Sequence, residues 1–247
     1  MSKALIIIPA RMSSSRFPGK PLININGKTM LERVWSCAVK ANIGDVYVAC
    51  CDKLGKGLLI KKKIPYIYTK KNLKSGTDRV YQAFLKVKNR RNYKIIINLQ
   101  GDIPFLNSNH LRRLYNILKN KNYQMATLAS DILEKKKIND SNIVKIAMTK
   151  WKKNIFRALY FSRTPIPYNS KKYYEHIGIY GYTPLLLKTF TNMKSSQLES
   201  CEKLEQLRAL ENEIAIYVGI VKDSPISIDT PMDLKKLNKI LKKRNRL

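Results

Sequence analysis

The sequence has few acidic side chains and few residues that bind transition metals. Its 247 residues include 17 Asp and Glu against 48 Lys and Arg, which gives a formal net charge of +31. It has only two histidines, and its four cysteines show no CxxC spacing. We therefore expect neither a zinc site nor a disulfide framework, and we predict that the cysteines are reduced and mostly structural.

Long hydrophobic runs are also missing. No apolar run approaches the roughly 20 residues that a membrane-spanning helix needs, and the N-terminus shows no separate apolar segment followed by a cleavage site. We therefore expect a soluble, cytoplasmic protein with no membrane partner. Hydrophobic residues still make up 44% of the chain, which is enough for one large α/β domain or for a core domain with a smaller annex.

The positive charge taken alone would indicate binding to nucleic acid or to an anionic membrane. The lysines are scattered along the whole chain, however, with short basic runs only at 61–63, 135–137 and 242–244. No RNP-type aromatic motif, zinc-finger spacing or basic heptad region accompanies them. We therefore expect no specific nucleic-acid partner, and only nonspecific affinity at low salt.

Strand-like and helix-like segments alternate over the first 130 residues. Apolar runs predict strands at 4–8, 46–50 and 93–99, and helical spacing of apolar residues follows the caps at Thr29 and Ser75. This repetition predicts a doubly wound α/β fold with a mixed, mainly parallel central sheet. Such sheets bind ligands at the carboxyl ends of their strands.

The alternation of strand-like and helix-like segments becomes less regular after about residue 130. The sequence predicts strands at 144–148, 158–161 and 177–182, a helix over about 197–211, a short strand at 226–228 and a last helix capped by Thr230. We expect a single domain spanning 1–247, with a core of about 1–130 and 185–247 and a small insertion at about 131–184. No internal repeat or long linker divides it.

The first apolar run opens into a small-residue loop that carries Arg11, Arg16 and Lys20. A buried strand that feeds a flexible cationic loop is how α/β proteins hold a polyphosphate. The three cations would neutralise charge that builds up during reaction. The same residues also suit an ordinary first strand followed by a basic surface loop.

Two carboxylates end predicted strands. Asp102 follows the run at 93–99, and Asp229 follows the short strand at 226–228. Such positions suit Mg²⁺, which prefers carboxylate, water and phosphate oxygens, although a plain turn or a helix cap would also explain them. The Ser75-Gly76 pair at a predicted helix start could offer backbone donors to a ligand, or could merely begin the helix.

Taken together, these motifs resemble the sugar-acid cytidylyltransferases, and among them those that use 3-deoxy-manno-octulosonate (Kdo). The resemblance covers nearly the whole chain. It rests on seven ordered segments: Pro9-Ala10-Arg11 with Ser15 to Leu22, Ser75 to Arg79, Gln100-Gly101-Asp102, Tyr160 to Arg163, His176 to Tyr182, Leu204 to Arg208, and Asp229-Thr230-Pro231.

The resemblance implies a Rossmann-like nucleotide-diphospho-sugar transferase fold and the reaction CTP + Kdo → CMP-Kdo + diphosphate, for the inner core of lipopolysaccharide. Arg11, Arg16, Lys20 and Asp102 would be catalytic, and Asp102 and Asp229 would hold Mg²⁺. The resemblance implies that the nucleotide is bound by Ala10, Arg11, Lys20, Ser75, Gly76 and Arg79.

It likewise implies a homodimer built largely on residues 155–185, so that the 131–184 insertion serves sugar binding and dimerisation. An arginine would bind the sugar carboxylate, and the sequence leaves open which one. The residues implied to line the sugar pocket are Arg79, Gln100, Arg163, His176, Tyr180, Glu205 and Gln206.

The chain departs from the family pattern at two places. Ile103 stands where the family usually has Glu, beside the expected metal site, and the second strand ends in Ala49-Cys50-Cys51-Asp52 instead of Ala-Thr-Asp. Two other functions stay open: a CMP-sialic acid (acylneuraminate) synthetase, and a nucleic-acid-binding protein on a degenerate nucleotidyltransferase core. Lys20, Asp102 and Asp229 together favour retained catalysis.

Overall fold

The computed structural model describes residues 3–12 and 17–244. The chain forms two compact units, which we describe separately. Unit I comprises Leu5–Arg91, Asn98–Ser108 and Pro225–Leu247, and unit II comprises Met1–Ala4, Asn92–Ile97 and Asn109–Ser224.

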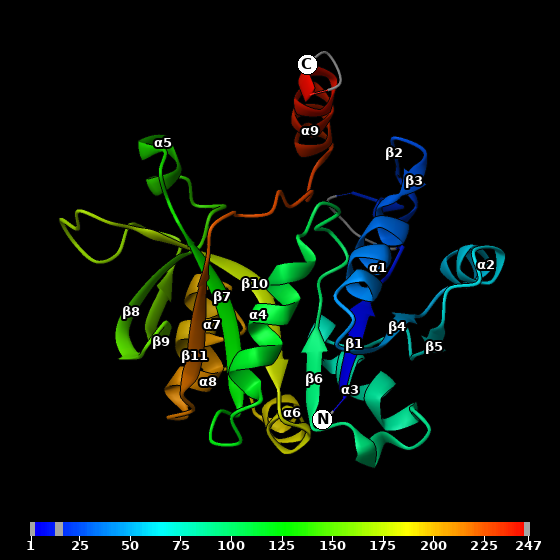
Figure 1. Cartoon of the computed structure of the whole chain (residues 1–247), viewed down its shortest axis with the longest axis horizontal. Helices are drawn as coiled ribbons and strands as arrows, with labels where there is room; N and C mark the ends of the chain where they lie inside the picture. The colour runs from blue at the N-terminus through cyan, green and yellow to red at the C-terminus, as the bar shows by residue number, and fades with distance from the viewer. Residues whose placement is uncertain (1–2, 13–16, 245–247) are drawn as a thin grey trace. The chain divides into compact units, whose positions relative to one another are not determined.

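Unit I alternates strands with helices (Figure 1). Its strands follow the order β5-β4-β1, and β4 pairs with β5 in parallel. The residues of β1 from Leu5 to Ile8 are fully buried, as expected for a strand of a parallel sheet that is covered on both faces. The elements are β1 (Ala4–Pro9), η1 (Lys20–Leu22), β2 (Asn24–Ile25), β3 (Lys28–Thr29), α1 (Met30–Lys40), β4 (Gly44–Cys50), α2 (Lys53–Lys61), β5 (Tyr66–Tyr68), α3 (Gly76–Lys86), η2 (Arg90–Asn92) and α9 (Pro231–Arg244).

The predicted helix starts in unit I are confirmed. Thr29 and Glu32 form a capping box at α1, and Ser75 and Asp78 form another at α3. In each box the hydroxyl accepts a backbone N–H of the first turn, while the carboxylate accepts the backbone N–H of the cap residue. α9 begins at Pro231 as expected and contributes to a small apolar core formed by Ile25, Met30, Ile228 and Leu237.

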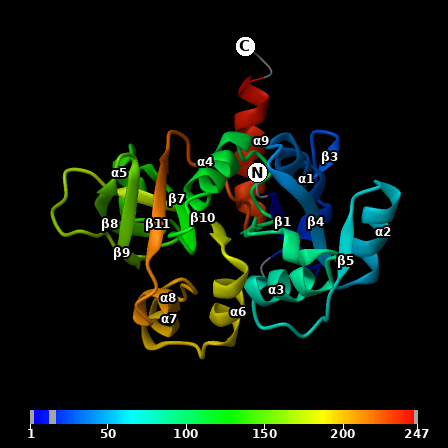
Figure 2. The same ribbon diagram turned by 60° about the horizontal axis from the view of Figure 1, so that its bottom comes forward.

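Unit II contains a sheet in the order β6-β10-β7-β11-β9-β8, with an additional β10–β8 pairing. Figure 2 shows β8, β9 and β11 side by side and the short helices α7 and α8 next to each other. The elements are β6 (Ile95–Asn98), α4 (Ser108–Leu118), β7 (Met125–Asp131), α5 (Lys135–Ile138), β8 (Lys145–Lys152), β9 (Ile155–Ser162), β10 (Tyr174–Tyr182), α6 (Pro184–Asn192), α7 (Gln197–Glu202), α8 (Leu207–Glu211) and β11 (Ile216–Val221).

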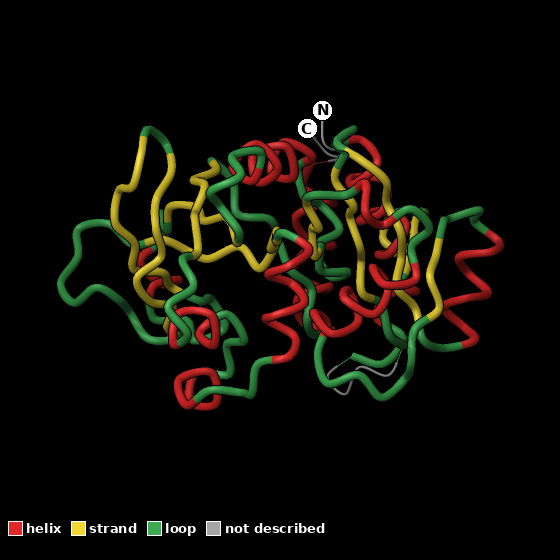
Figure 3. Tube along the Cα trace, turned by 90° about the horizontal axis from the view of Figure 1, so that it is seen from below, coloured by secondary structure: helices red, strands yellow, loops and turns green. Residues whose placement is uncertain are grey.

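The prediction of a mainly parallel central sheet is wrong. The strands do form a mixed arrangement: β4–β5 and β7–β11 pair in parallel, but β10 pairs antiparallel with β7 and β8, and β9 pairs antiparallel with β8 and β11. Parallel neighbours need a long crossover, usually a helix. Two residues join β8 to β9, and the β9–β10 connection carries no helix (Figure 3).

Two predicted elements are also wrong in detail. The helix expected over 197–211 is broken into α7 and α8, because Lys203 takes a left-handed conformation (φ 56°). Glu205 and Gln206 consequently lie in the turn between the two helices. The stretch 226–228 forms no strand; it is tied instead by a hydrogen bond of 2.9 Å from the Ile228 N–H to the carbonyl of Asp102.

Across residues 3–12 and 17–244, no helix is long and apolar enough to cross a membrane. The four cysteines are free thiols, as predicted: Cys37, Cys50 and Cys51 are buried and Cys201 is exposed.

Candidate active site

A pocket of about 220 Å³ lies in unit I at the carboxyl end of β1, beside the segment 100–102 that follows β6. Its floor is shaped by close backbone approach: a Cβ added at Gly101 would stand 3.2 Å from the carbonyl oxygen of Pro9, so only glycine leaves that approach undisturbed. The pocket is lined by Pro9, Ala10, Arg11, Lys20, Pro21, Leu31, Leu73, Lys74, Ser75, Gly76, Arg79, Gln100, Gly101, Asp102 and Asp229.

Lys20 links the two predicted strand-end carboxylates. Its Nζ lies 3.0 Å from Asp102 Oδ2 and 3.1 Å from Asp229 Oδ1. Desolvation by burial raises the pKa of Asp102, the Lys20 ammonium opposes this shift, and the neighbouring Asp229 carboxylate adds to it. The chain thus brings two carboxylates together and balances them with one cation.

These two carboxylates fit a magnesium ion. A cation, the Lys20 ammonium, already lies within 3.1 Å of both, so the spot suits positive charge. The described part of the chain holds no group of three or more His, Cys, Asp or Glu side chains that could hold a metal by themselves. Mg²⁺ is usually held by one or two carboxylates together with water and substrate phosphates, and this donor set matches that requirement.

The cationic loop is only partly described. Ala10 is buried, and its N–H donates to the carbonyl of Ala49 at 2.9 Å. Arg11 is exposed and lines the pocket. Arg16 lies outside the described residues. Ala10, Arg11 and Lys20 thus share one pocket, as the sequence suggested.

The start of α3 forms another part of the pocket wall. The Ser75 hydroxyl accepts from the Asp78 N–H at 3.1 Å, and the Ser75 N–H donates to the Asp78 carboxylate at 3.0 Å. The side chain of Ser75 is therefore engaged in capping. The positive end of the helix dipole faces the pocket at Ser75 and Gly76, which favours an anion there.

Arg79 is buried at 3% exposure although it is charged. Its guanidinium donates to Thr69 Oγ1 at 2.6 Å, to the Lys70 carbonyl at 3.0 Å and to the Lys71 carbonyl at 3.5 Å. These acceptors are neutral, and Arg79 makes no ion pair with an acidic side chain of the described residues. Because neutral oxygens accept its hydrogen bonds without neutralising its charge, the buried Arg79 guanidinium favours an anionic ligand in the pocket beside it.

Like Arg79, Gln100 lines the pocket of unit I, and the other predicted sugar-site residues lie in unit II. His176 Nε2 is 3.0 Å from Thr127 Oγ1, and that hydroxyl also lies 2.9 Å from the Ile179 carbonyl. Because the single hydroxyl proton goes to a carbonyl, Nε2 carries the proton in the His176–Thr127 hydrogen bond. Desolvation by burial lowers the pKa of His176 to about 3, so the imidazole is neutral.

Tyr180 packs beside His176, with ring centroids 5.3 Å apart. Among the described residues, its buried hydroxyl and the buried Nε2 of Gln206 have no hydrogen-bond partner. Burial raises the pKa of Tyr180, and Tyr182 and Glu205 raise it further. Buried polar atoms without partners are costly, which makes these two side chains good candidates for ligand contacts.

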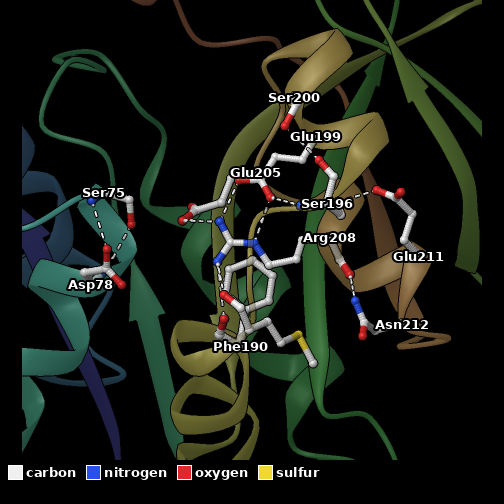
Figure 4. A network of polar contacts seen from close by, with 11 residues as sticks. Ser75, Asp78, Phe190, Ser196, Glu199, Ser200, Glu205, Arg208, Glu211 and Asn212 are labelled. Atoms are coloured by element: carbon white, nitrogen blue, oxygen red, sulfur yellow. Dashed lines mark hydrogen bonds and ion pairs between the residues drawn. The ribbon is translucent and has the colours of Figure 1, made fainter.

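Glu205 lies beside a salt-bridge network (Figure 4). Arg208 binds Glu199 with two nitrogens, at 2.5 and 2.8 Å, and its guanidinium lies 4.0 Å from the Glu205 carboxylate. The same guanidinium stacks over the Phe190 ring at 5.1 Å. The network fixes the α7–α8 turn that carries Glu205 and Gln206.

Arg163 has local partners in unit II. Its Nε donates to the Glu202 carbonyl at 2.7 Å and its Nη1 to the Ser141 carbonyl at 2.9 Å. The fully buried Lys145 donates to the Arg163 carbonyl at 2.5 Å. Much of the Arg163 guanidinium is therefore used to hold neighbouring loops.

Sequence reasoning missed some residues of the pocket. Leu31, Leu73 and Lys74 line it. In the sequence, Leu31 has the pattern of a core residue of a helix, and Lys74 is not distinguishable from the many other lysines. Asp52 does not line the pocket, but its carboxylate accepts the Met12 N–H of the cationic loop. The sequence predicted no such role for it, although it follows a predicted strand just as Asp102 does. That shared position was the available signal.

Comparisons with known proteins agree with this picture. The family described as "Cytidylyltransferase" matches residues 5–218. A 3-deoxy-manno-octulosonate cytidylyltransferase of Bartonella bacilliformis is 41% identical over 97% of this chain and 98% of its own length. The enzyme of the same name from Rickettsia prowazekii is 41% identical over 98% of this chain and 96% of its own length.

A solved structure is similar over the same extent. CMP:2-keto-3-deoxy-manno-octonic acid synthetase complexed with CTP matches with a TM-score of 0.89 and 34% identity, covering 98% of this chain and all of the other. An apo UDP-glucose pyrophosphorylase matches with a TM-score of 0.70 at 14% identity, which shows a shared fold alone.

The fold, together with a cationic pocket that faces paired carboxylates, defines a nucleotidyltransferase of the nucleotide-diphospho-sugar transferase fold. Identity near 40% over nearly the full length narrows the class. The chain belongs to the cytidylyltransferase family and, within it, to the 3-deoxy-manno-octulosonate cytidylyltransferases. The family resemblance read from the sequence is confirmed.

Proposed function

We propose that this protein transfers CMP from CTP to the anomeric hydroxyl of Kdo, releasing diphosphate and supplying CMP-Kdo for the lipopolysaccharide core. The observation that carries the proposal is the pocket in which Lys20 lies within 3.1 Å of both Asp102 and Asp229. Cations and paired carboxylates at strand ends are what an in-line nucleotidyl transfer requires.

The nucleotide occupies the pocket of unit I. Arg11 and Lys20 bind the triphosphate and stabilise the charge that develops on the leaving diphosphate. Ala10 and the start of α3 at Ser75 and Gly76 contact the cytidine nucleotide. Arg16 belongs to the same loop and shares the task of Arg11.

Asp102 and Asp229 would hold magnesium. When bound, the ion lowers the pKa of the attacking hydroxyl and neutralises phosphate charge. Asp102 and Asp229 are far apart in the sequence, and the Lys20 ammonium neutralises part of their combined negative charge. This role follows from the donor chemistry of the pocket, where both carboxylates face one cation.

In each unit, taken by itself, polar side chains are candidates for recognising the sugar acid. The Tyr180 hydroxyl and the Gln206 Nε2 are buried without a hydrogen-bond partner among the described residues, and Glu205 lies 4.0 Å from the Arg208 guanidinium. Between the two candidate arginines, Arg79 suits the sugar carboxylate or a phosphate better, because it lines the pocket and its buried charge has no acidic partner among the described residues. Gln100 and His176 complete the proposed set.

The domain organisation and assembly are proposed as well. The chain forms one catalytic domain whose 131–184 insertion contributes to sugar binding and to a homodimer. Exposed apolar side chains within 155–185 support this interface, since Leu159 is 58% and Tyr168 97% exposed. We also propose a cytoplasmic location, where CTP is available. Light scattering coupled to size exclusion tests the dimer.

One assay tests the reaction. Diphosphate release from CTP and Mg²⁺ is measured with Kdo, with sialic acid and with no sugar acid. We expect release with Kdo alone, and the CMP-Kdo product is verified by mass. Release no faster with Kdo than without sugar overturns the proposal, and release only with sialic acid assigns the other substrate.

A further inference from the structure

Asp52 occupies the junction between β4 and α2, and its carboxylate makes two different backbone contacts. Oδ1 accepts the Gly55 N–H at 2.7 Å, which caps α2. Oδ2 accepts the Met12 N–H at 3.1 Å, across 40 residues of sequence. The first contact is ordinary capping, whereas the second reaches into the cationic loop.

Met12 is held on both sides. While its N–H donates to Asp52, its carbonyl accepts the Gly19 N–H at 3.0 Å. Met12 and Gly19 are therefore joined to each other and anchored through Asp52. Arg11 precedes one of these anchored residues and Lys20 follows the other, so this hydrogen-bond chain sets where both cations leave the backbone.

Electrostatics alone does not explain an acidic residue here. The charges of Asp52 and Arg11 both act on the neighbouring Cys51 thiol, with opposite signs, which places Asp52 in the electrostatic environment of the cationic loop. A negative charge there repels a triphosphate. A cap alone needs only one acceptor oxygen, which Ser, Thr or Asn supplies as well as Asp. The second carboxylate oxygen is the feature that aspartate adds.

We propose that Asp52 is a positioning residue for nucleotide transfer: by tethering Met12, it holds Arg11 and Lys20 where they meet the triphosphate. The proposal rests on the function proposed above. Asp52 touches neither substrate nor reacting atoms, and it acts through the backbone of the loop. A displacement of about 1 Å at such cations is enough to cost up to about 100-fold in rate.

Variants at position 52 separate capping from tethering. Asp52→Ala removes both contacts. Asp52→Ser keeps an acceptor for the Gly55 N–H but is too short to reach Met12 as well. Asp52→Asn keeps only one acceptor oxygen, because its amide nitrogen is a donor, so it cannot satisfy both N–H groups.

Gly55 offers a probe that leaves the charge in place. A Cβ added there would lie 2.9 Å from Asp52 Oδ1 and 3.0 Å from Met12 Cε. Gly55→Ala therefore pushes on the carboxylate and on Met12 while it raises helix propensity in α2. Glu32→Ala is the matched control, because Glu32 is a half-buried carboxylate that caps α1 in the same unit and does not line the pocket.

The readouts are CTP affinity by calorimetry with Mg²⁺, KM for CTP and kcat by diphosphate release, and Tm. We expect Asp52→Ala, Asp52→Ser and Asp52→Asn each to weaken CTP binding about 10-fold or more. Asp52→Ser and Asp52→Asn should recover most of the Tm that Asp52→Ala loses. Gly55→Ala should weaken CTP binding without lowering Tm, and Glu32→Ala should lower Tm without changing CTP affinity.

Other outcomes overturn the proposal. If the position 52 variants bind CTP as the wild type does, Asp52 serves only as a cap. If Asp52→Asn or Asp52→Ser binds CTP more tightly, removal of a repulsive charge outweighs any tether. A wild type that binds no CTP overturns the proposed function itself, and the role of Asp52 with it.

Discussion

The two units carry different kinds of candidate residues. In unit I the Asp102–Lys20–Asp229 group is charged, partly open to solvent and joined by ion pairs, with side-chain exposures from 14% to 38%. In unit II the Tyr180 and Gln206 side chains are uncharged and buried, and the Tyr180 hydroxyl and the Gln206 Nε2 have no hydrogen-bond partner among the described residues. The first group pairs its charges, whereas the second pair of side chains leaves polar atoms free for a ligand.

This contrast indicates which environment suits groups that neutralise phosphate and which suits groups that recognise hydroxyls. Groups that neutralise phosphate must be able to change partners, so they lie at strand ends beside solvent. Groups that recognise hydroxyls gain selectivity from burial, since an unfilled hydrogen bond there is costly. Substitutions within the Asp102–Lys20–Asp229 group should therefore affect turnover most, whereas substitutions of Tyr180 or Gln206 should affect substrate affinity or stability.

The largest expected effect belongs to unit I. Asp102→Asn removes a charge from the proposed metal site at nearly constant shape, and we expect kcat to fall about 1,000-fold. Burial already disfavours the ionised form of Asp102 and raises its pKa, so the neutral amide should not lower stability. Diphosphate release and thermal unfolding check both parts.

Glu32→Gln is the control, since it changes a carboxylate outside the pocket in the same unit. It should keep turnover near the wild-type value. A folded Asp102→Asn protein with kcat within about 10-fold of the wild type would remove Asp102 from the metal site.

The sequence predicted unit I better than unit II, and the reason is physical. In unit I, caps and apolar runs act locally, so Thr29, Ser75 and Pro231 marked helix starts correctly. In unit II, strand direction depends on which distant strands pair. The β8–β9 connection is only two residues long and the β9–β10 connection has no helix, so neither can join parallel neighbours, and the alternating pattern of unit I does not extend to them.

Side-chain contacts were harder to predict than strand ends. The order of motifs indicated that Lys20, Asp102 and Asp229 belong together, and the structure places them within one pocket. Nothing in the sequence indicated that Lys203 breaks a helix, or that Arg208 and Glu199 fix the resulting turn. Such contacts depend on packing between segments that are distant in the sequence, and local sequence patterns do not predict that packing.

A smaller effect is expected from pH in unit II. Burial lowers the pKa of His176 to about 3, whereas an unfolded histidine titrates near 6.5. Between these values the unfolded chain binds more protons than the folded one, so stability is lost as pH falls below about 6.5. From about pH 6.5 to about pH 5 the loss amounts to about 2 kcal/mol from this residue.

His176→Gln tests this prediction by urea unfolding at about pH 7.5 and about pH 5. Glutamine can still bond to Thr127 but does not titrate, so the variant should lose about 2 kcal/mol less on acidification than the wild type. His110, whose pKa is also lowered by burial, is present in both proteins and cancels. Equal acid sensitivity would show that His176 titrates as an exposed histidine.

The smallest predicted effect is also the most specific to unit II. Tyr180→Phe removes a buried hydroxyl that has no hydrogen-bond partner in the described part of the chain, so the variant should keep or slightly raise Tm. If that hydroxyl awaits the sugar acid, KM for Kdo should rise about 5-fold, or about 1 kcal/mol, with KM for CTP unchanged. Tyr182→Phe, a neighbouring ring on the same strand, is the comparison. An unchanged KM for Kdo in the Tyr180→Phe protein would mean that the buried hydroxyl is a tolerated defect of the core, and that the contrast between the two units does not extend to this side chain.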